Sequence, residues 1–139
     1  MEKIHEFLEP PHLQLVEHAR QLYSLRSNSR KVPKYSVTYL SWKPTPGMCH
    51  QNCEHWEKLY PDDTAVYGWL CFDFSASGFF RFASHTVIRT QSQHLIDITP
   101  TNTEELRPFL EDFTLESTYD QFVLDLHTKH KVTLLDHKI

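Results

Sequence analysis

The middle of the chain holds three extended segments in close succession, and this pattern constrains the fold more than any other feature of the sequence. The segments cover about residues 65–74, 79–90 and 93–98 and are rich in valine, isoleucine and aromatic residues. Short polar stretches, Ser75–Gly78 and Thr90–Ser92, separate them. Parallel strands need crossover connections of about a dozen residues or more, so these short connections predict an antiparallel sheet.

Two helices are expected before this sheet. Residues 10–25 begin with two prolines, which suit the first turn of a helix, and then place apolar side chains at three- and four-residue spacing. Residues 48–60 place Cys49, Cys53 and Trp56 on one helical face, and a proline follows the segment. We therefore expect both segments to be amphipathic helices on which the sheet packs.

The remaining segments have weaker patterns. A short strand is expected over residues 35–42, and a short helix is expected to open near Thr103 and to stop at Pro108. Residues 119–126 suit either a helix or a strand, and residues 131–135 suit a terminal strand. Together the elements predict an α+β fold with N-terminal helices packed on an antiparallel sheet.

The composition excludes several classes of protein. With 139 residues, we expect a single domain spanning 1–139, and no run of about 18 apolar residues is present to cross a membrane. A formal charge of −4 argues against a nucleic-acid binder, although partial protonation of the ten histidines would bring the charge towards neutrality. The N-terminus lacks the features of a signal peptide, and an odd number of cysteines does not suit a disulfide framework. A cytoplasmic location is expected.

Cys49 is the residue from which we expect the chemistry of this chain to start. It follows the turn-forming pair Pro46–Gly47 and stands where a loop enters a helix. Unpaired N–H groups and the positive end of the helix dipole stabilise a thiolate at that place, so the thiol pKa is expected to be lowered. A thiolate of low pKa beside a histidine is what nucleophilic cysteine catalysis requires.

His85 and Asp97 are the expected base and its orienting carboxylate. If the chain folds back at residues 90–92, Arg89 pairs with Gln93 and His85 pairs with Asp97. The two side chains then share one face of the sheet, because side chains alternate along a strand. A carboxylate beside an imidazole fixes its tautomer and stabilises its charged form, which predicts a triad of Cys49, His85 and Asp97.

Three further residues are candidates for contact with a substrate. Asn52 lies one helical turn after Cys49, where its amide either orients a substrate carbonyl or ties down the preceding loop. Gly68 stands in the first long strand, where a glycine often marks close approach by another backbone or by a ligand. Trp69 follows it and either walls a cleft or packs in the core. An oxyanion hole is expected at the backbone N–H of Cys49.

The order of these motifs resembles the core of transglutaminase-like and papain-like cysteine enzymes. The string Cys-His-x-Asn, Gly-Trp, His-x-Val and Asp-Ile-Thr-Pro is also similar to a group of small bacterial proteins, and the resemblance covers the core motif region 46–100. It implies Cys49 as nucleophile, His85 as general base and Asp97 as orienter. It further implies a cysteine hydrolase or acyl-transferase of peptidase, amidase or deamidase type, with a peptide or other amide-containing substrate. No cofactor is expected.

Two other interpretations of the same residues remain open. Cys49, Cys53 and His85 are an admissible set for a structural zinc site, although no second compact ligand pair follows in the sequence. The chain also suits an inactive protein-interaction module that presents strand aromatics such as Phe79 and Phe80. A strongly lowered thiol pKa favours the enzyme, whereas stoichiometric zinc favours the metal site.

Overall fold

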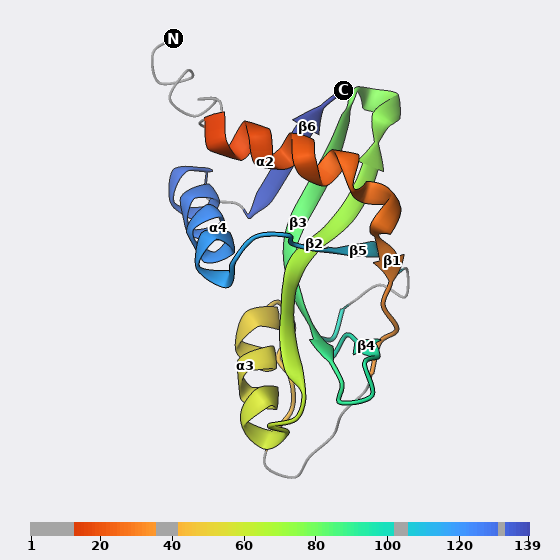
Figure 1. Ribbon diagram of the computed structural model, residues 1–139, viewed down its shortest axis with the longest axis vertical. Coiled ribbons are helices and arrows are strands. Elements are labelled where there is room, and N and C mark those ends of the chain that lie inside the picture. Colours follow the sequence, from red (N-terminus) through yellow and green to blue (C-terminus); the bar gives the residue numbers. More distant parts are fainter. Residues whose placement is uncertain (1–12, 36–41, 102–105, 131–132) are drawn as a thin grey trace.

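A long hairpin forms the centre of the fold (Figure 1). The computed structural model describes residues 13–35, 42–101, 106–130 and 133–139. Strands β2 (Thr64–Phe74) and β3 (Phe79–Arg89), each of eleven residues, pair along their whole length. Gly78 ends the connection in the left-handed region, with φ of 90°, which a glycine adopts without strain.

Four shorter strands extend this hairpin into an antiparallel sheet. They are β1 (Arg30–Lys31), β4 (Leu95–Ile96), β5 (Pro108–Glu111) and β6 (Leu134–Lys138). The order is β1-β5-β2-β3-β4, and β6 shares the outer edge of β3 with β4. The pairing with β6 covers residues 79–83 and the pairing with β4 covers residues 88–89. Residues 85–87 of β3 therefore have no strand partner on this edge among the described strands.

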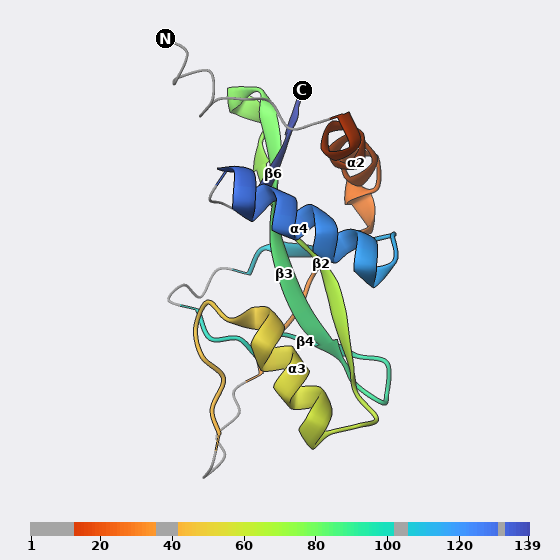
Figure 2. The ribbon, with the colours of Figure 1, turned by 90° about the vertical axis from the view of Figure 1, so that its left-hand side faces the viewer.

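The described helices all pack on one face of the sheet. Helices α2 (Leu13–Ser24) and α4 (Glu116–His130) cover its upper half in Figures 1 and 2, and α3 (Cys49–Leu59) covers its lower half. The upper core joins apolar residues of both helices to alternate residues of β2 and β3, among them Leu15, Leu22, Trp69, Phe82, Tyr119 and Leu126. A second cluster joins Cys53 and Trp56 of α3 to the sheet. No described helix is long and apolar enough to span a membrane.

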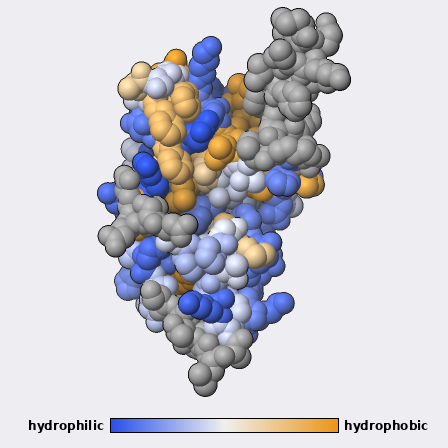
Figure 3. All heavy atoms as spheres, turned by 180° about the vertical axis from the view of Figure 1, so that it is seen from behind, coloured by the Kyte–Doolittle hydropathy of each residue, from blue (hydrophilic) through white to orange (hydrophobic). Residues whose placement is uncertain are grey.

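The opposite face of the sheet carries a smaller apolar cluster. It consists of Val66, Val87 and Phe109 together with Val32, which directly follows strand β1. In the view from behind, hydrophobic residues gather over the upper half of the molecule, whereas the lower half is mostly hydrophilic (Figure 3). The sheet is thus covered by helices on one side and by strand ends and loops on the other.

The main elements of the sequence prediction are confirmed. The fold is α+β with an antiparallel sheet, α3 lies within the predicted 48–60, and β2 and β3 match their predicted spans to within one residue. The described part of the first predicted helix is helical from Leu13 to Ser24. The strand predicted at 35–42 and the helix predicted to open at Thr103 fall largely outside the described residues.

Other predictions need correction. The strand expected over residues 93–98 is reduced to Leu95–Ile96, because residues 90–94 form a loop that Thr90 N–H closes on the carbonyl of His94 at 2.8 Å. Pro108 begins strand β5 at the one strand position where a proline costs no ladder hydrogen bond. The ambiguous segment 119–126 is helical, and the terminal strand starts at Leu134 rather than near 131.

The hairpin register also differs from the prediction. Arg89 pairs with Leu95 instead of Gln93, so the pairing is displaced by two residues. The left-handed backbone of Gln93, with φ of 71°, belongs to this longer loop. A displacement of two residues preserves the alternation of side chains, so His85 and Asp97 still lie on the same face of the sheet.

Candidate catalytic site

Cys49 is the first residue of α3, and its half-buried side chain lies at the open edge of β3. Gly47 enters the turn before the helix with φ of 77°, and Met48 occupies the N-cap position without a side-chain cap. The first N–H groups of a helix have no acceptor within the helix and carry the positive end of its dipole. The thiol is therefore placed where negative charge is stabilised, as the sequence predicted.

Thr86 of β3 makes several of the contacts that hold the start of α3 against the sheet. The N–H of Thr86 bonds to the thiol of Cys49, and its carbonyl accepts a bond from Sγ of Cys53 at 3.6 Å. Its hydroxyl bonds to Nδ1 of His50. Burial lowers the pKa of His50, which favours the neutral ring in this contact. The helix start thus uses the backbone groups of β3 that no neighbouring strand takes.

His85 and Asp97 form a buried pair beside this cysteine. Nε2 of His85 bonds to Oδ2 of Asp97 over 2.7 Å, and both side chains are more than nine-tenths buried. The other carboxylate oxygen, Oδ1, accepts the N–H of Thr99 at 3.1 Å. Because Nε2 is engaged by the carboxylate, Nδ1 is the ring nitrogen left for the side-chain hydrogen bond between His85 and Cys49.

Lys34 is a fourth member of this row of side chains. Its ammonium bonds to Oδ2 of Asp97 and to the carbonyl of Thr99, each at 2.9 Å. The backbone of this segment also brackets Asp97, since Asp97 N–H bonds to the carbonyl of Pro33 and Tyr35 N–H bonds to the carbonyl of Asp97, each at 2.9 Å. Asp97 is thus fixed both through its side-chain carboxylate and through its backbone.

The pKa values of the three groups are shifted in a concerted way. Burial opposes ionisation of Cys49, but the hydrogen bond and charge of His85 and the N–H of Thr86 outweigh it and lower its pKa. Burial also opposes protonation of His85, but its bonds to Asp97 and Cys49 raise its pKa to about 9. Burial of Asp97 is likewise outweighed by His85 and Lys34, and its pKa is lowered. These directions favour a thiolate–imidazolium–carboxylate arrangement.

Asn52 is buried and acts as a structural tie. Its Oδ1 accepts the N–H of Thr45 at 3.0 Å, and its Nδ2 donates to the carbonyl of Thr45 at 2.9 Å and to Oγ1 of Thr99 at 3.0 Å. Both donors of the amide are therefore used within the protein. Of the two interpretations of Asn52, the contacts support the one in which it ties down the loop before Cys49.

Gly68 and Trp69 do not face an open cleft. A Cβ atom at Gly68 would lie 2.3 Å from the carbonyl oxygen of Leu110 and 2.6 Å from the ring of Phe109, so the glycine admits the close approach of β5. Trp69 is fully buried in the upper core, and its Nε1 donates to Oδ1 of Asp112 at 2.9 Å. Of the two interpretations given for each residue, the contacts support close approach by another backbone at Gly68 and core packing at Trp69.

The other cysteines differ from Cys49 in their environment. All three are free thiols, and Cys53 and Cys71 are buried. Burial raises the pKa of Cys53 above its ordinary value and raises the pKa of Cys71 to about 12. Cys49 is thus the one cysteine whose thiolate is favoured. Within the described ranges, no three His, Cys, Asp or Glu side chains are grouped so that they would hold a metal ion. Cys49, Cys53 and His85, the set considered for zinc, therefore do not form such a group.

A second buried histidine–carboxylate pair lies elsewhere in the fold. Nε2 of His18 bonds to Oδ1 of Asp112 at 2.7 Å, and the N–H of Thr114 donates to its Oδ2 at 3.0 Å. With the bond from Trp69, this carboxylate joins α2, β2 and the loop before α4. The three free cysteines lie on α3 and β2, and none is bonded to this pair. The pair resembles His85–Asp97 in geometry but has no cysteine beside it.

Sequence reasoning missed two residues that build the site. Lys34 lies 63 residues from Asp97 in the chain, and an isolated lysine after a proline has no pattern that predicts such a contact. Thr86 contributes mainly through its backbone groups, which side-chain identity does not encode. The gap between the pairings of β3 with β4 and β6 leaves the backbone of Thr86 free for these contacts.

Fold and site together define an α+β protein with a buried Cys–His–Asp row at the start of a helix. No family model, curated protein or solved structure matches this chain. We therefore infer its function from the arrangement of its side chains.

Proposed function

We propose that this chain is a cysteine hydrolase or acyl-transferase that acts on amide or other acyl bonds, with a peptide or other amide-containing molecule as substrate. The observation that carries the proposal is the buried His85–Asp97 bond of 2.7 Å beside Cys49, where the thiol pKa is lowered and the imidazole pKa is raised to about 9. Such a row is the requirement for nucleophilic cysteine catalysis.

The first half of the reaction forms an acyl-enzyme. The thiolate of Cys49 donates an electron pair to the substrate carbonyl carbon, the C–S bond forms, and the carbonyl π electrons move to its oxygen. We assign the N–H of Cys49 at the helix start as a donor for that oxyanion. When the oxyanion collapses, the bond to the leaving group breaks, and the imidazolium of His85 gives its proton to that group.

The second half of the reaction regenerates the thiolate. Neutral His85 takes a proton from a water molecule or from an amine, and the resulting nucleophile attacks the thioester carbon. The C–S bond breaks, its electron pair returns to Cys49, and the product is an acid or a new amide. Asp97 remains ionised throughout, because it holds the imidazole and stabilises its charged form.

The resemblance to papain-like and transglutaminase-like enzymes supports the same chemistry. In both, the cysteine opens a helix while the histidine and the carboxylate follow on the sheet, and this chain has that order in Cys49, His85 and Asp97. We place the protein in the cytoplasm, where three unpaired thiols are compatible with the reducing conditions.

A labelling experiment tests the nucleophile directly. The wild-type protein and its Cys49→Ala, His85→Ala and Cys53→Ala variants are treated with a chloroacetamide, and the modified residue is identified by mass spectrometry as a function of pH. We expect rapid, selective labelling of Cys49 at pH 7, loss of that reaction in His85→Ala, and no change in Cys53→Ala. Equal labelling of Cys49 at pH 7 in wild type and His85→Ala would contradict the proposal.

Turnover is measured with activated acyl esters and with peptides that contain glutamine, in the presence and absence of a primary amine. Cys49→Ser and His85→Ala are expected to abolish the release of the leaving group while the near-ultraviolet circular dichroism stays that of the wild type. Incorporation of the amine distinguishes transfer from hydrolysis. A folded Cys49→Ser protein that retains full turnover would rule out the triad assignment.

A further inference from the structure

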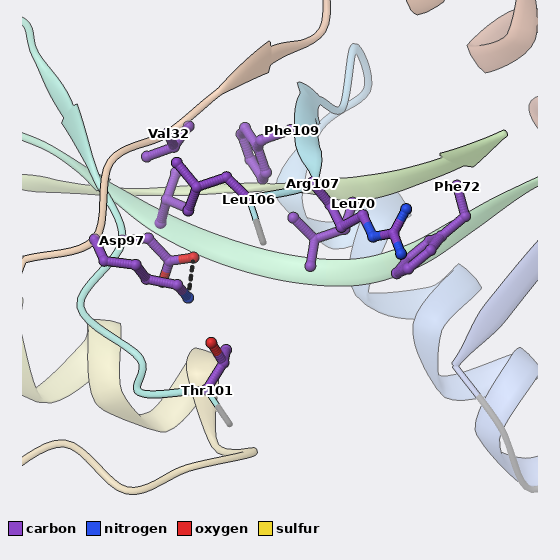
Figure 4. A pocket seen from close by; sticks show the side chains of 10 residues that line it. Val32, Leu70, Phe72, Asp97, Thr101, Leu106, Arg107 and Phe109 are labelled. Atoms are coloured by element: carbon purple, nitrogen blue, oxygen red, sulfur yellow. Dashed lines mark hydrogen bonds and ion pairs between the residues drawn. The ribbon is translucent and has the colours of Figure 1, made fainter. Parts of the chain in front are cut away.

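A pocket of about 340 Å³ lies on the sheet face opposite the helices (Figure 4). This volume falls at the lower end of the range of about 300–1,000 Å³ that is usual for small-molecule sites. Its walls are mainly apolar and come from β2, β3, β5 and the segments beside them: Val32, Leu70, Phe72, Val87, Leu106 and Phe109. The pocket is thus shaped for the apolar body of a small ligand.

The charged side chains that line this pocket are mostly cationic. Among the described lining residues these are Lys34, Arg107 and Asp97, and Asp97 is paired with Lys34. Both carboxylate oxygens of Asp97 already accept hydrogen bonds within the protein. The guanidinium of Arg107 lies 4.8 Å from the ring centroid of Phe72, which holds this cation at one end of the pocket.

Lys34 supplies a directed donor inside the pocket. An ammonium group has three N–H donors, and the bonds to Asp97 and Thr99 use two of them. The side chain is one-third exposed and lines the pocket, so we assign its remaining donor to a ligand bound there. In Figure 4 Asp97, the carboxylate that Lys34 bonds, lies at one end of the pocket, and Leu70 and Phe72 lie towards the other end.

We propose that this pocket binds a small organic anion with an apolar body, such as a carboxylate of an aliphatic or aromatic acid. The anionic group accepts the third N–H of Lys34, and the apolar body lies against Leu70, Val87 and Phe109. Charge-assisted hydrogen bonds of this kind are among the stronger ones. The inference goes beyond the proposed catalysis, because no step of the binding uses Cys49.

Binding is tested with the Cys49→Ala protein, so that the result does not depend on turnover. The probe is 8-anilinonaphthalene-1-sulfonate, an aromatic body with a sulfonate, and its fluorescence is titrated at fixed ionic strength. Straight-chain carboxylates from butanoate to decanoate then compete with the probe, and the alkylammonium ions of matching length serve as the reversed-charge control. We expect saturable binding of one probe per chain, displaced by the longer carboxylates and not by the ammonium ions.

Two variants assign the binding to this pocket. Lys34→Met is expected to weaken probe binding about tenfold, whereas Lys58→Met, at an exposed position of α3, leaves it unchanged. Leu70→Trp is expected to abolish binding by filling the pocket while Lys34 is retained, which keeps the test valid if Lys34→Met does not fold. Absence of saturable binding, equal displacement by alkylammonium ions, or undiminished binding in a folded Leu70→Trp protein would overturn the proposal.

Discussion

The side chains of His85 and Asp97 meet at 2.7 Å between Nε2 and Oδ2, although the two residues lie on different elements. Oδ2 of Asp97 also accepts the ammonium of Lys34 at 2.9 Å. Oδ2 of Asp97 therefore accepts hydrogen bonds from two cationic groups in a buried site. These groups lower the pKa of Asp97, although burial alone would raise it. This carboxylate is the group on which the ionisation of the whole row depends.

Asp97→Asn is expected to reduce the reactivity of Cys49. An amide does not stabilise the imidazolium, so the pKa of His85 falls, and with the loss of its charge the pKa of Cys49 rises. The rate of chloroacetamide labelling at pH 7 is expected to fall by about tenfold or more, since each unit of thiol pKa changes the thiolate fraction by about tenfold. The rate is measured by mass spectrometry from pH 5 to pH 10.

Asp112→Asn is the matched control for that substitution. It alters the second buried histidine–carboxylate pair, which is bonded to no cysteine. We expect a decrease of about 1–3 kcal/mol in the free energy of unfolding, measured with urea, and an unchanged pH profile for the labelling of Cys49. Equal losses of thiol reactivity in the two variants would mean that the effect of Asp97→Asn is only structural.

Turnover is expected to follow a bell-shaped pH profile. Activity rises with pH as Cys49 ionises, and the midpoint of this limb lies below the ordinary thiol pKa of about 8.5, because the folded site lowers the pKa of Cys49. Activity falls again as His85 loses its proton near pH 9, since the neutral imidazole no longer protonates the leaving group. The two midpoints belong to the coupled pair, and they are measured from kcat/KM between pH 4 and pH 10. A profile that keeps rising above pH 9 would contradict the raised pKa of His85.

The His85–Asp97 pair was predictable from the sequence because it depends on the alternation of side chains rather than on the register, whereas the position of Cys49 beside it had to be assumed. The predicted pairing of His85 with Asp97 was displaced by two residues, since residues 90–94 form a longer loop than expected. Alternation survives such a displacement, so both side chains remain on one face. The start of α3 at Cys49 was predictable from the turn before it and from the spacing of its apolar residues.

Other parts of the site depend on contacts that no local pattern encodes. Trp69 follows Gly68, and the register places Gly68 opposite His85, so the indole points to the helix-covered face and not to the site. Lys34 reaches Asp97 only because the chain crosses the sheet beside it. Strand β5 was missed because Pro108 predicts the end of a helix, whereas here it opens a strand.

Asn52→Ala is expected to loosen the loop that leads into Cys49. The substitution removes three hydrogen bonds, two to the backbone of Thr45 and one to the hydroxyl of Thr99, and leaves buried polar groups without partners. We expect a decrease of about 1–3 kcal/mol in the free energy of unfolding and a lower kcat at unchanged thiol pKa. Gln51→Ala, at the exposed neighbouring position, is the control and is expected to change neither quantity. A folded Asn52→Ala protein whose KM rises while its stability is unchanged would instead assign the amide to substrate binding.

Gly68→Ala tests whether the close approach of β5 shapes the site. The added Cβ would lie 2.3 Å from the carbonyl oxygen of Leu110 and 2.6 Å from the ring of Phe109, and backbone atoms do not move aside cheaply. Overpacking of this kind typically costs about 1–3 kcal/mol, and the ring of Phe109, whose centroid lies 6.4 Å from that of His85, is displaced with it. We therefore expect a lower free energy of unfolding together with slower labelling of Cys49.

Gly47→Ala separates this steric effect from backbone strain, because a Cβ there meets nothing within 4 Å while φ is 77°. It is expected to cost about 1–2 kcal/mol through the left-handed backbone alone. A Gly68→Ala protein as stable as the wild type would show that β5 does not press against the sheet at this point.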